Sequence, residues 1–539
     1  MVKTALPACP IQPLHEYLRM HARERPDAAA LVWYGTVLSW SDLDRASDAF
    51  AARLQALGVK KGDPVVLFLG NCPQYVVAHY GIQKIGAVVC PNGPLNKEHE
   101  LAYQVNDLNA RVIVAAAALL PVVQKVKPVS TLAHVFIVHY ADLLPAQPTL
   151  DLPAELSTAR EDARVVPTDC EDFLAVMSGS ARPASVELDM DDLALMLYTS
   201  GTTGLPKGAM LTYGNALYKT RTSAFAMGVE RDDTQLCVAP MYHVAGMLTG
   251  VNVPVLCGDT AVLLHRFEPR ATLQAIDRYR ITAWYSIAPM NAACMQQPDI
   301  TRFDLSSLSK NTVTSFGIAF TEALALQWKS FAPNAHAREA AYGLSETHSC
   351  DTYMPTNAIR WGTVGLAVPG VVIRILDPDT GDALAAGEQG EIVLTSPGVF
   401  KGYFNNPEAT AATLRDGWVH TGDMGRMDAD GYLTFMGRFK EMIKVSGYPV
   451  FPEEVETILI KHPAISQVAV VAQPDVDKGE VVKAFVVKKA GTELAADELI
   501  VWCRDNMAPY KAPRHVRFLD ALPTAGAGKV LRRLLKDVE

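Results

Sequence analysis

The chain has 539 residues, of which 49% are hydrophobic and 20% are charged. This length exceeds what one hydrophobic core usually supports, so we predict at least two domains. The net charge of −9 supplies no basic surface for nucleic acid or for an anionic membrane, which argues against both as partners.

No segment of the chain has the features of a membrane or secretory element. The first 20 residues contain no apolar signal core, and the longest apolar stretch, residues 112–123, is too short to span a bilayer. The nine cysteines include no C-x-x-C pair, which favours free thiols over disulfides or a zinc site. We therefore expect a cytoplasmic enzyme without a transmembrane segment.

Strand and helix patterns alternate through the first several hundred residues. Residues 64–70 predict a buried strand, and residues 72–89 continue as a helix and a second strand. Residues 261–289 again predict strand, helix and strand. This alternation is typical of an α/β fold with mostly parallel sheets covered by helices.

The pattern changes from about Trp361. Short strands separated by Asp, Gly and Pro turns predict a small β subdomain as far as residue 437. A shorter α+β pattern follows, with helices at 452–462 and 495–507 and strands at 465–473 and 482–489. We place a domain boundary near Gly437–Lys440, which gives an N-terminal domain of residues 1–437 and a C-terminal domain of residues 438–539.

A glycine- and hydroxyl-rich loop, YTSGTTGLPKGAML at residues 198–211, follows a predicted buried strand and precedes a predicted helix. Its glycines let backbone N–H groups approach an anion, while its hydroxyls and its lysine add donors and positive charge. The sequence is not a Walker A motif. A flexible turn-rich surface loop and a polyphosphate site both fit the composition. The residues concerned are Thr199, Ser200, Gly201, Thr202, Thr203, Gly204 and Lys207.

Five further segments accompany this loop in order along the chain: residues 239–247 (APMYHVAGM), 341–347 (AYGLSET), 420–425 (HTGDMG), 437–456 and 522–533. Together the six segments resemble the motifs of the adenylate-forming superfamily, which includes acyl-CoA synthetases, adenylation domains of peptide synthetases and luciferases. The resemblance covers nearly the whole chain. It is strongest to AMP-forming ligases that join fatty or related carboxylic acids to coenzyme A.

The resemblance implies a reaction in two halves. A carboxylate attacks the α-phosphate of ATP bound with Mg²⁺, giving an acyl-adenylate and pyrophosphate, and the thiol of coenzyme A then displaces AMP. The protein contributes mainly positioning and charge stabilisation to such a transfer. ATP, Mg²⁺ and coenzyme A are the implied cofactors and co-substrates, and a homodimer is the assembly common in the family.

The resemblance also implies roles for individual residues. Lys529 is expected to stabilise the adenylation transition state, although Ala525 replaces the threonine usual in that motif. Glu346 is expected to bind Mg²⁺, and Thr347 to hydrogen-bond the α-phosphate. The adenine and ribose are expected to contact Ala341, Tyr342, Gly343, Asp423 and Arg438.

The segment after the boundary resembles the hinge of the superfamily. Lys440 stands at the hinge position, and rotation of the C-terminal domain there is expected to exchange Lys529 for the strand around Lys444 between the two half-reactions. Gly447 is expected to leave room for the pantetheine arm of coenzyme A.

The acid is the least determined feature. His243 has no acidic neighbour in its motif, which disfavours an amino-acid substrate because a buried ammonium would lack a counter-ion. His243 is expected to gate the passage between the adenylate and the thiol, a satisfied core histidine being the alternative. The expected pocket residues are mostly apolar: Met247, Trp284, Phe316, Gly317 and Ile318, with Ser286, Ala288 and Met290 as further candidates.

These residues favour a medium- or long-chain fatty acid. An aryl or alicyclic acid is the first alternative. An acyl-AMP ligase that loads a carrier protein is the second, and a non-catalytic nucleotide-binding protein is the third.

Overall fold

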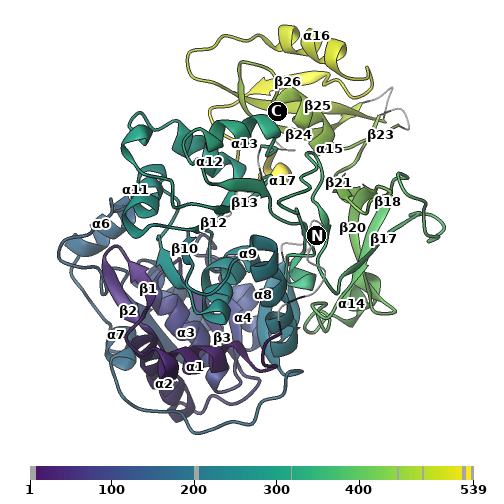
Figure 1. The fold of residues 1–539 in the computed structure, drawn as a ribbon. Coiled ribbons are helices and arrows are strands. Elements are labelled where there is room, and N and C mark those ends of the chain that lie inside the picture. Colours follow the sequence, from purple (N-terminus) through teal and green to yellow (C-terminus); the bar gives the residue numbers. More distant parts are fainter. Residues whose placement is uncertain are drawn as a thin grey trace.

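The computed structural model describes residue 6 and residues 8–199, 205–316, 318–445, 448–475, 479–524 and 530–535. Two large sheets with helices around them form most of the chain, and a smaller unit lies at the top of the view in Figure 1. The predicted α/β fold with mostly parallel sheets is confirmed.

The first large sheet has the strand order β7-β6-β5-β3-β4-β8-β9 and is parallel except for β9, which runs antiparallel to β8. Its strands are β3 (Pro64–Phe68), β4 (Val88–Pro91), β5 (Val112–Ala116), β6 (His134–Val138), β7 (Glu171–Asp172), β8 (Leu193–Thr199) and β9 (Lys207–Thr212).

The second large sheet has the order β14-β13-β12-β10-β11-β1-β2 and is parallel except for the β1–β2 pair. Its strands are β1 (Ala29–Trp33), β2 (Thr36–Ser39), β10 (Thr234–Cys237), β11 (Thr260–Leu263), β12 (Ala283–Ile287), β13 (Lys310–Thr314) and β14 (His336–Glu339).

Helices surround these two sheets, and side chains from both sheets join one large hydrophobic core. The helices of this part are α1 (Leu14–Glu24), α2 (Trp40–Ala56), α3 (Pro73–Lys84), α4 (Glu98–Leu108), α5 (Leu120–Val126), α6 (Ala154–Glu161), α7 (Phe173–Met177), α8 (Tyr213–Met227), α9 (Val244–Met247), α10 (Val253–Cys257), α11 (Pro269–Tyr279), α12 (Ala288–Met295) and α13 (Glu322–Lys329).

Helix α3 is buried along its whole length. Its sequence has no continuous polar face, as expected of a helix that packs on all sides. Its one lysine, Lys84, is fully buried and contacts Asp44 and Asp48 of α2, with both Nζ–Oδ1 distances at 2.6 Å. A buried charge is tolerated here because it is paired.

The predicted β subdomain is an antiparallel sheet of the order β17-β18-β20-β19, with β21 also paired to β20. The strands are β17 (Val372–Leu376), β18 (Gly390–Thr395), β19 (Leu414–Arg415), β20 (Trp418–Met427) and β21 (Leu433–Arg438), with helix α14 (Pro407–Thr413) and a separate pair, β15 (Thr352–Tyr353) and β16 (Leu366–Ala367).

The C-terminal unit has its own hydrophobic core, whose first member in the chain is Ile443. We therefore propose that the domain boundary lies at the expected place, near Gly437–Lys440. The elements of this unit are β22 (Ile443–Val445), β23 (Tyr448–Val450), α15 (Pro452–Leu459), β24 (Ile465–Asp475), β25 (Gly479–Lys488), α16 (Ala496–Asn506), β26 (His515–Phe518) and α17 (Arg532–Leu535).

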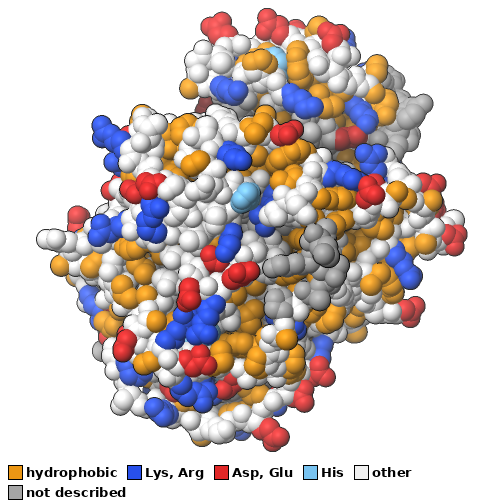
Figure 2. All heavy atoms as spheres, viewed as in Figure 1, with side chains coloured by type: hydrophobic (Ala, Val, Ile, Leu, Met, Phe, Trp, Pro, Cys, Tyr) orange, Lys and Arg blue, Asp and Glu red, His pale blue; other side chains and the backbone are white. Residues whose placement is uncertain are grey.

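Three further features bear on the sequence predictions. None of the described helices combines the length and hydropathy that crossing a bilayer requires. On the face shown in Figure 2, Lys and Arg side chains are interspersed with Asp and Glu, without a continuous basic stripe. All nine cysteines lie in the described residues as free thiols.

Candidate active site

The predicted phosphate loop connects two antiparallel strands at one end of the first sheet. Thr199 at the end of β8 lies opposite Lys207 at the start of β9. Because β8 runs parallel to β4, the loop leaves from the carboxyl ends of parallel strands, where ligands bind in α/β folds. Ser200, Gly201, Thr202, Thr203 and Gly204 lie outside the described residues.

A segment at 400–404 pairs with β9 and brings Tyr403 to this loop. Phe404 N donates to Gly208 O at 2.8 Å, and the Nζ of Lys207 lies 4.5 Å from the centroid of the Tyr403 ring. The Tyr403 hydroxyl donates to Glu346 Oε1 at 2.6 Å. Tyr403 therefore joins the phosphate-loop lysine to the predicted metal ligand.

Glu346 lies in a short 3-10 turn, Ser345–Thr347. Its backbone oxygen accepts from Phe400 N at 2.8 Å. Its Oε2 makes no hydrogen bond to any described residue, so this carboxylate oxygen is available to a cation. Mg²⁺ is commonly bound by one or two protein carboxylates together with substrate phosphates, and no cluster of three or more potential His, Cys, Asp or Glu ligands occurs among the described residues.

Thr347 lies differently from what the sequence predicts. Its side chain is fully buried, and its hydroxyl donates to Asp351 Oδ2 at 2.5 Å. A hydroxyl with its proton engaged in the core cannot also donate to a phosphate. The neighbouring Ser345 is half-buried, and its hydroxyl makes no hydrogen bond to a described residue.

The predicted nucleotide residues come together at the β20–β21 pair. Asp423 and Arg438 are opposite each other in register, with Arg438 Nε 3.1 Å from Asp423 Oδ1. The Tyr342 hydroxyl donates to Asp423 Oδ2 at 2.7 Å. Ala341 is half-buried, and a Cβ at Gly343 would lie 2.6 Å from Cys350 N, so the close approach there requires glycine.

The proposed hinge segment follows Arg438 directly in the chain. Lys440 lies in a 3-10 turn, Phe439–Glu441, next to Arg438. Lys444 is exposed on β22, and Gly447 and Lys529 lie outside the described residues.

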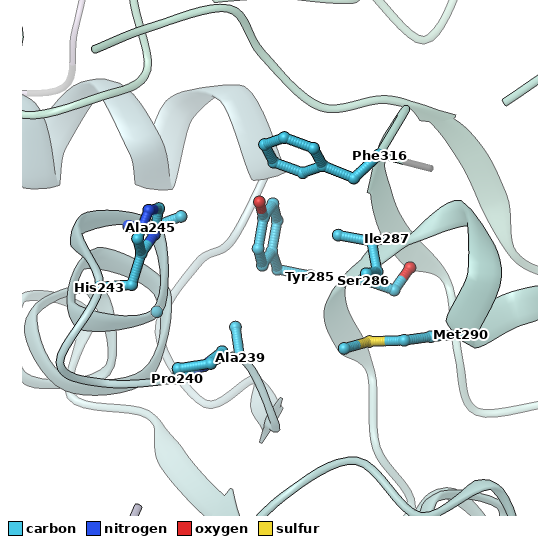
Figure 3. A pocket seen from close by; sticks show the side chains of 10 residues that line it. Ala239, Pro240, His243, Ala245, Tyr285, Ser286, Ile287, Met290 and Phe316 are labelled. Atoms are coloured by element: carbon cyan, nitrogen blue, oxygen red, sulfur yellow. Dashed lines mark hydrogen bonds between the residues drawn. The ribbon is translucent and has the colours of Figure 1, made fainter. Parts of the chain in front are cut away.

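A small cavity lies beside His243. The cavity in its present form has a volume of about 30 Å³. Figure 3 shows the Tyr285 ring in its centre, with Phe316 and His243 around it. None of the residues that line it is an Asp or Glu; they are Ala239, Pro240, His243, Ala245, Gly246, Tyr285, Ser286, Ile287, Met290 and Phe316.

Comparison with known proteins identifies the family. Residues 18–404 match the AMP-binding enzyme family, and residues 454–529 match the AMP-binding enzyme C-terminal domain. The chain belongs to the AMP-binding enzymes. This places it in the adenylate-forming superfamily, as the motifs predict.

Individual relatives of this AMP-binding enzyme match over nearly their whole length. A long-chain-fatty-acid–CoA ligase from Bacillus subtilis is 34% identical, covering 98% of this chain and 95% of that protein. A feruloyl-CoA synthase from Amycolatopsis is 33% identical, covering 95% and 96%. The crystal structure of ATP-bound MatB from Rhodopseudomonas palustris matches with a TM-score of 0.82 at 26% identity, covering 98% and 99%.

Four of the expected or candidate pocket residues of the AMP-binding enzyme do not line the cavity. Met247 and Trp284 are fully buried in the core. Side chains alternate between the two faces of a strand, so Trp284 on β12 faces away from Tyr285, and it packs against Trp328 with ring centroids 6.0 Å apart. Ile318 and Ala288 are also absent from the lining.

His243 and Phe316 do line the cavity as predicted, together with Ser286 and Met290. Gly317 lies outside the described residues. Tyr285 and Ile287 were not expected there.

A buried carboxylate supports the loop that carries Phe316. Glu339, at the end of β14, accepts from the backbone N of Ser315 at 3.0 Å and from its hydroxyl at 2.6 Å. The Ser315 Oγ in turn accepts from Phe320 N at 2.8 Å. Burial raises the pKa of Glu339 to about 7.

Proposed function

We propose that this AMP-forming acid–CoA ligase activates a medium- or long-chain fatty acid. The observation that carries the proposal is the apolar cavity beside His243, whose lining contains no carboxylate and so offers no partner for an amino group. The likeness to a long-chain-fatty-acid–CoA ligase at 34% identity supports it.

A fatty acid needs more space than the present cavity offers. A volume of about 30 Å³ is far below the roughly 300–1,000 Å³ of typical ligand pockets. Entry of an alkyl chain therefore requires Tyr285, Phe316 or Met290 to move. Phe316 is only half-buried, and the adjoining Met290 has three rotatable bonds, which makes both suitable for such movement.

In the adenylation half-reaction, the acid carboxylate attacks the α-phosphorus while pyrophosphate leaves. Lys207 stands beside the phosphate loop to offset the charge of the phosphates, and Glu346 presents its unbonded oxygen to a metal ion. Mg²⁺, when bound, would neutralise phosphate charge. We assign the hydroxyl contact with the α-phosphate to Ser345, because Thr347 is engaged with Asp351.

The nucleoside would be held at the β20–β21 pair. Asp423 is nearly fully buried and is oriented by Tyr342 and Arg438, which prepares its carboxylate to accept hydrogen bonds from ribose hydroxyls. Tyr342 would lie against the adenine. Lys529 would supply positive charge to the transition state.

The thioester half-reaction would follow rotation about Lys440. The acyl-adenylate carbonyl carbon is attacked by the thiol sulfur of coenzyme A, the thiol proton is lost, and AMP leaves. We propose that Lys444 and Gly447 then face the active site and that His243 controls passage of the thiol.

An aryl acid is a second candidate. Two aromatic rings, Tyr285 and Phe316, contact the small cavity, and flat aryl groups stack on such rings in offset or edge-to-face geometry. The 33% identity to a feruloyl-CoA synthase points the same way.

The substrate is tested by kcat/KM for a series of saturated fatty acids and for hydroxycinnamic and benzoic acids, measured as thioester formation with ATP, Mg²⁺ and coenzyme A. The proposal predicts that a saturated acid has the highest kcat/KM, rising with chain length up to an optimum. Preference for an aryl acid by tenfold or more, equivalent to about 1.4 kcal/mol, would contradict it and establish the second candidate.

A further inference from the structure

A fully buried ion pair lies behind the loop that carries Glu346. Lys219 of α8 contacts Asp351 through its Nζ, and neither side chain is exposed to solvent. The Lys219 Nζ also donates to the backbone oxygen of Cys350 at 3.2 Å. Burying two charges costs more than their attraction returns unless additional hydrogen bonds complete the pair. Here the backbone oxygen of Cys350 and the Thr347 hydroxyl complete the pair, so it forms a satisfied buried network that holds these segments in one arrangement.

Asp351, the other member of the pair, is hydrogen-bonded to the residue that follows Glu346, the candidate metal ligand. Asp351 Oδ2 accepts from the Thr347 hydroxyl, and Asp351 N donates to Tyr342 O at 2.7 Å. Thr347 directly follows Glu346, and Tyr342 is the proposed adenine contact. The Lys219–Asp351 pair thus fixes both ends of the loop that would hold the nucleotide and its metal ion.

The loop needs such support because its backbone is strained. Three consecutive residues that are not glycine, His348, Ser349 and Cys350, have φ values of +55°, +62° and +51°. Each left-handed residue of this kind costs roughly 1–2 kcal/mol. Such conformations persist where the surroundings determine them, and Lys219 bonds directly to the last of the three.

Helix α8 also holds the second segment that contacts Glu346. Asn215, one turn before Lys219, donates its Nδ2 to Pro397 O at 2.8 Å and to Val399 O at 3.1 Å. The next residue, Phe400, bonds the Glu346 backbone. Gly398 leaves space for the lysine stem, since a Cβ there would lie 2.2 Å from Lys219 Cε.

We infer that Lys219, through its buried pair with Asp351, is a positioning residue that sets the Glu346 carboxylate for metal binding. Lys219 and Asn215 lie four residues apart on one face of α8, and between them they anchor the two segments around Glu346. The inference rests on the proposed role of Glu346 as the Mg²⁺ ligand.

The test is the Mg²⁺ concentration for half-maximal pyrophosphate release by the full chain, at a temperature well below its unfolding midpoint. The pair is replaced as a whole in K219M/D351L, because removing one partner would leave a buried charge. G398A is a second variant, which displaces the lysine stem without removing any charge. K84M/D44L/D48L is the matched control, since Lys84 is a fully buried lysine of α3 and this variant removes it together with both of its carboxylate partners.

We expect the first two variants to raise the required Mg²⁺ by about 10- to 100-fold, the range seen when supports of a metal ligand are removed. The control should lose thermal stability with less than a twofold change in Mg²⁺ requirement. If E346Q raises the requirement but neither Lys219–Asp351 variant does so beyond the control, the inference is wrong and the proposed function stands. If E346Q leaves the titration unchanged, the metal role of Glu346 fails and the inference fails with it.

Discussion

Ser345 and Thr347 lie two residues apart on one turn, but the core engages only one of their hydroxyls. Thr347 donates to Asp351, while Ser345 makes no hydrogen bond to a described residue. The motif AYGLSET contains both hydroxyls, so the sequence leaves their roles ambiguous. The buried acceptor at Asp351 decides between them.

Ser345→Ala should lower the rate of acid-dependent pyrophosphate release. A hydrogen bond to a charged group contributes about 1.5–3 kcal/mol, which corresponds to roughly 10- to 150-fold. Thr347→Ser keeps a hydroxyl for Asp351 and serves as the control, with a change below threefold. A larger loss for Thr347→Ser than for Ser345→Ala would reverse the assignment.

Glu339 is expected to make stability depend on pH. Its pKa is raised by burial from 4.5 to about 7 in the folded state. Between these two pH values the folded chain therefore binds a proton at Glu339 more readily than the unfolded chain does. Its stabilising contribution is complete below about pH 4.5 and is lost as the pH rises through 7.

Glu339→Gln removes this titration. Its unfolding free energy should therefore rise relative to that of the unmodified protein between about pH 5 and pH 7, by at most about 1.4 kcal/mol per pH unit. Denaturant unfolding across this range measures the difference. Parallel pH profiles for the two proteins would show that Glu339 keeps its ordinary pKa.

Among the elements, strands and helices with a clear period could be predicted from the sequence. Residues 72–89 became α3 and β4, and residues 268–280 contain α11. The residues that line the cavity were harder to predict, because both faces of β12 carry large apolar or aromatic side chains and the sequence AWYSI does not show which face lines the cavity. Trp284 was therefore expected where Tyr285 lies. The left-handed turn at 348–350 has no glycine to reveal it.

The loop after β13 should limit the length of the acyl chain through Phe316. Phe316→Ala would enlarge the cavity, and each newly buried CH₂ group contributes about 0.8 kcal/mol. The ratio of kcat/KM for a long saturated acid to that for a short one should therefore rise at least several-fold. An unchanged ratio would show that the acyl chain of the substrate does not extend past Phe316.

At the scale of the whole molecule, the order of six motifs was sufficient to predict the superfamily, and the alternation of strand and helix patterns was sufficient to predict the α/β fold. Contacts between segments that are far apart in the sequence could not be predicted in this way. Tyr403 joins Lys207 to Glu346 across nearly 200 residues of chain, and its segment GYF contains no pattern that indicates a role. Pairing of residues 400–404 with β9 is visible only after folding.

In the C-terminal unit, ion pairs connect helix α17 to residues near the proposed hinge and in α15. Arg532 contacts Glu441, Glu453 and Glu456, with the last at 2.8 Å from Nη2 to Oε2. Glu441 is next to the proposed hinge residue Lys440. The segment that follows Lys529 is therefore tied to the residues that would rotate with it.

Lys529→Ala should affect the two half-reactions unequally. Loss of one preorganised charge donor is expected to slow adenylation by roughly 10²–10³-fold, measured as acid-dependent exchange of pyrophosphate into ATP. Transfer from preformed acyl-AMP to coenzyme A should change far less, because Lys529 is expected to leave the site for that step. An equal loss in both would contradict the rotation.

The most direct test of the whole account is the stoichiometry of products from a long-chain fatty acid, with and without coenzyme A. With ATP, Mg²⁺ and coenzyme A, the account predicts continuous turnover with acyl-CoA, AMP and pyrophosphate in equal amounts. Without coenzyme A, it predicts one pyrophosphate per active site and then a stop. The same single burst in both conditions, or no pyrophosphate at all, would contradict an acyl-CoA ligase that uses fatty acids.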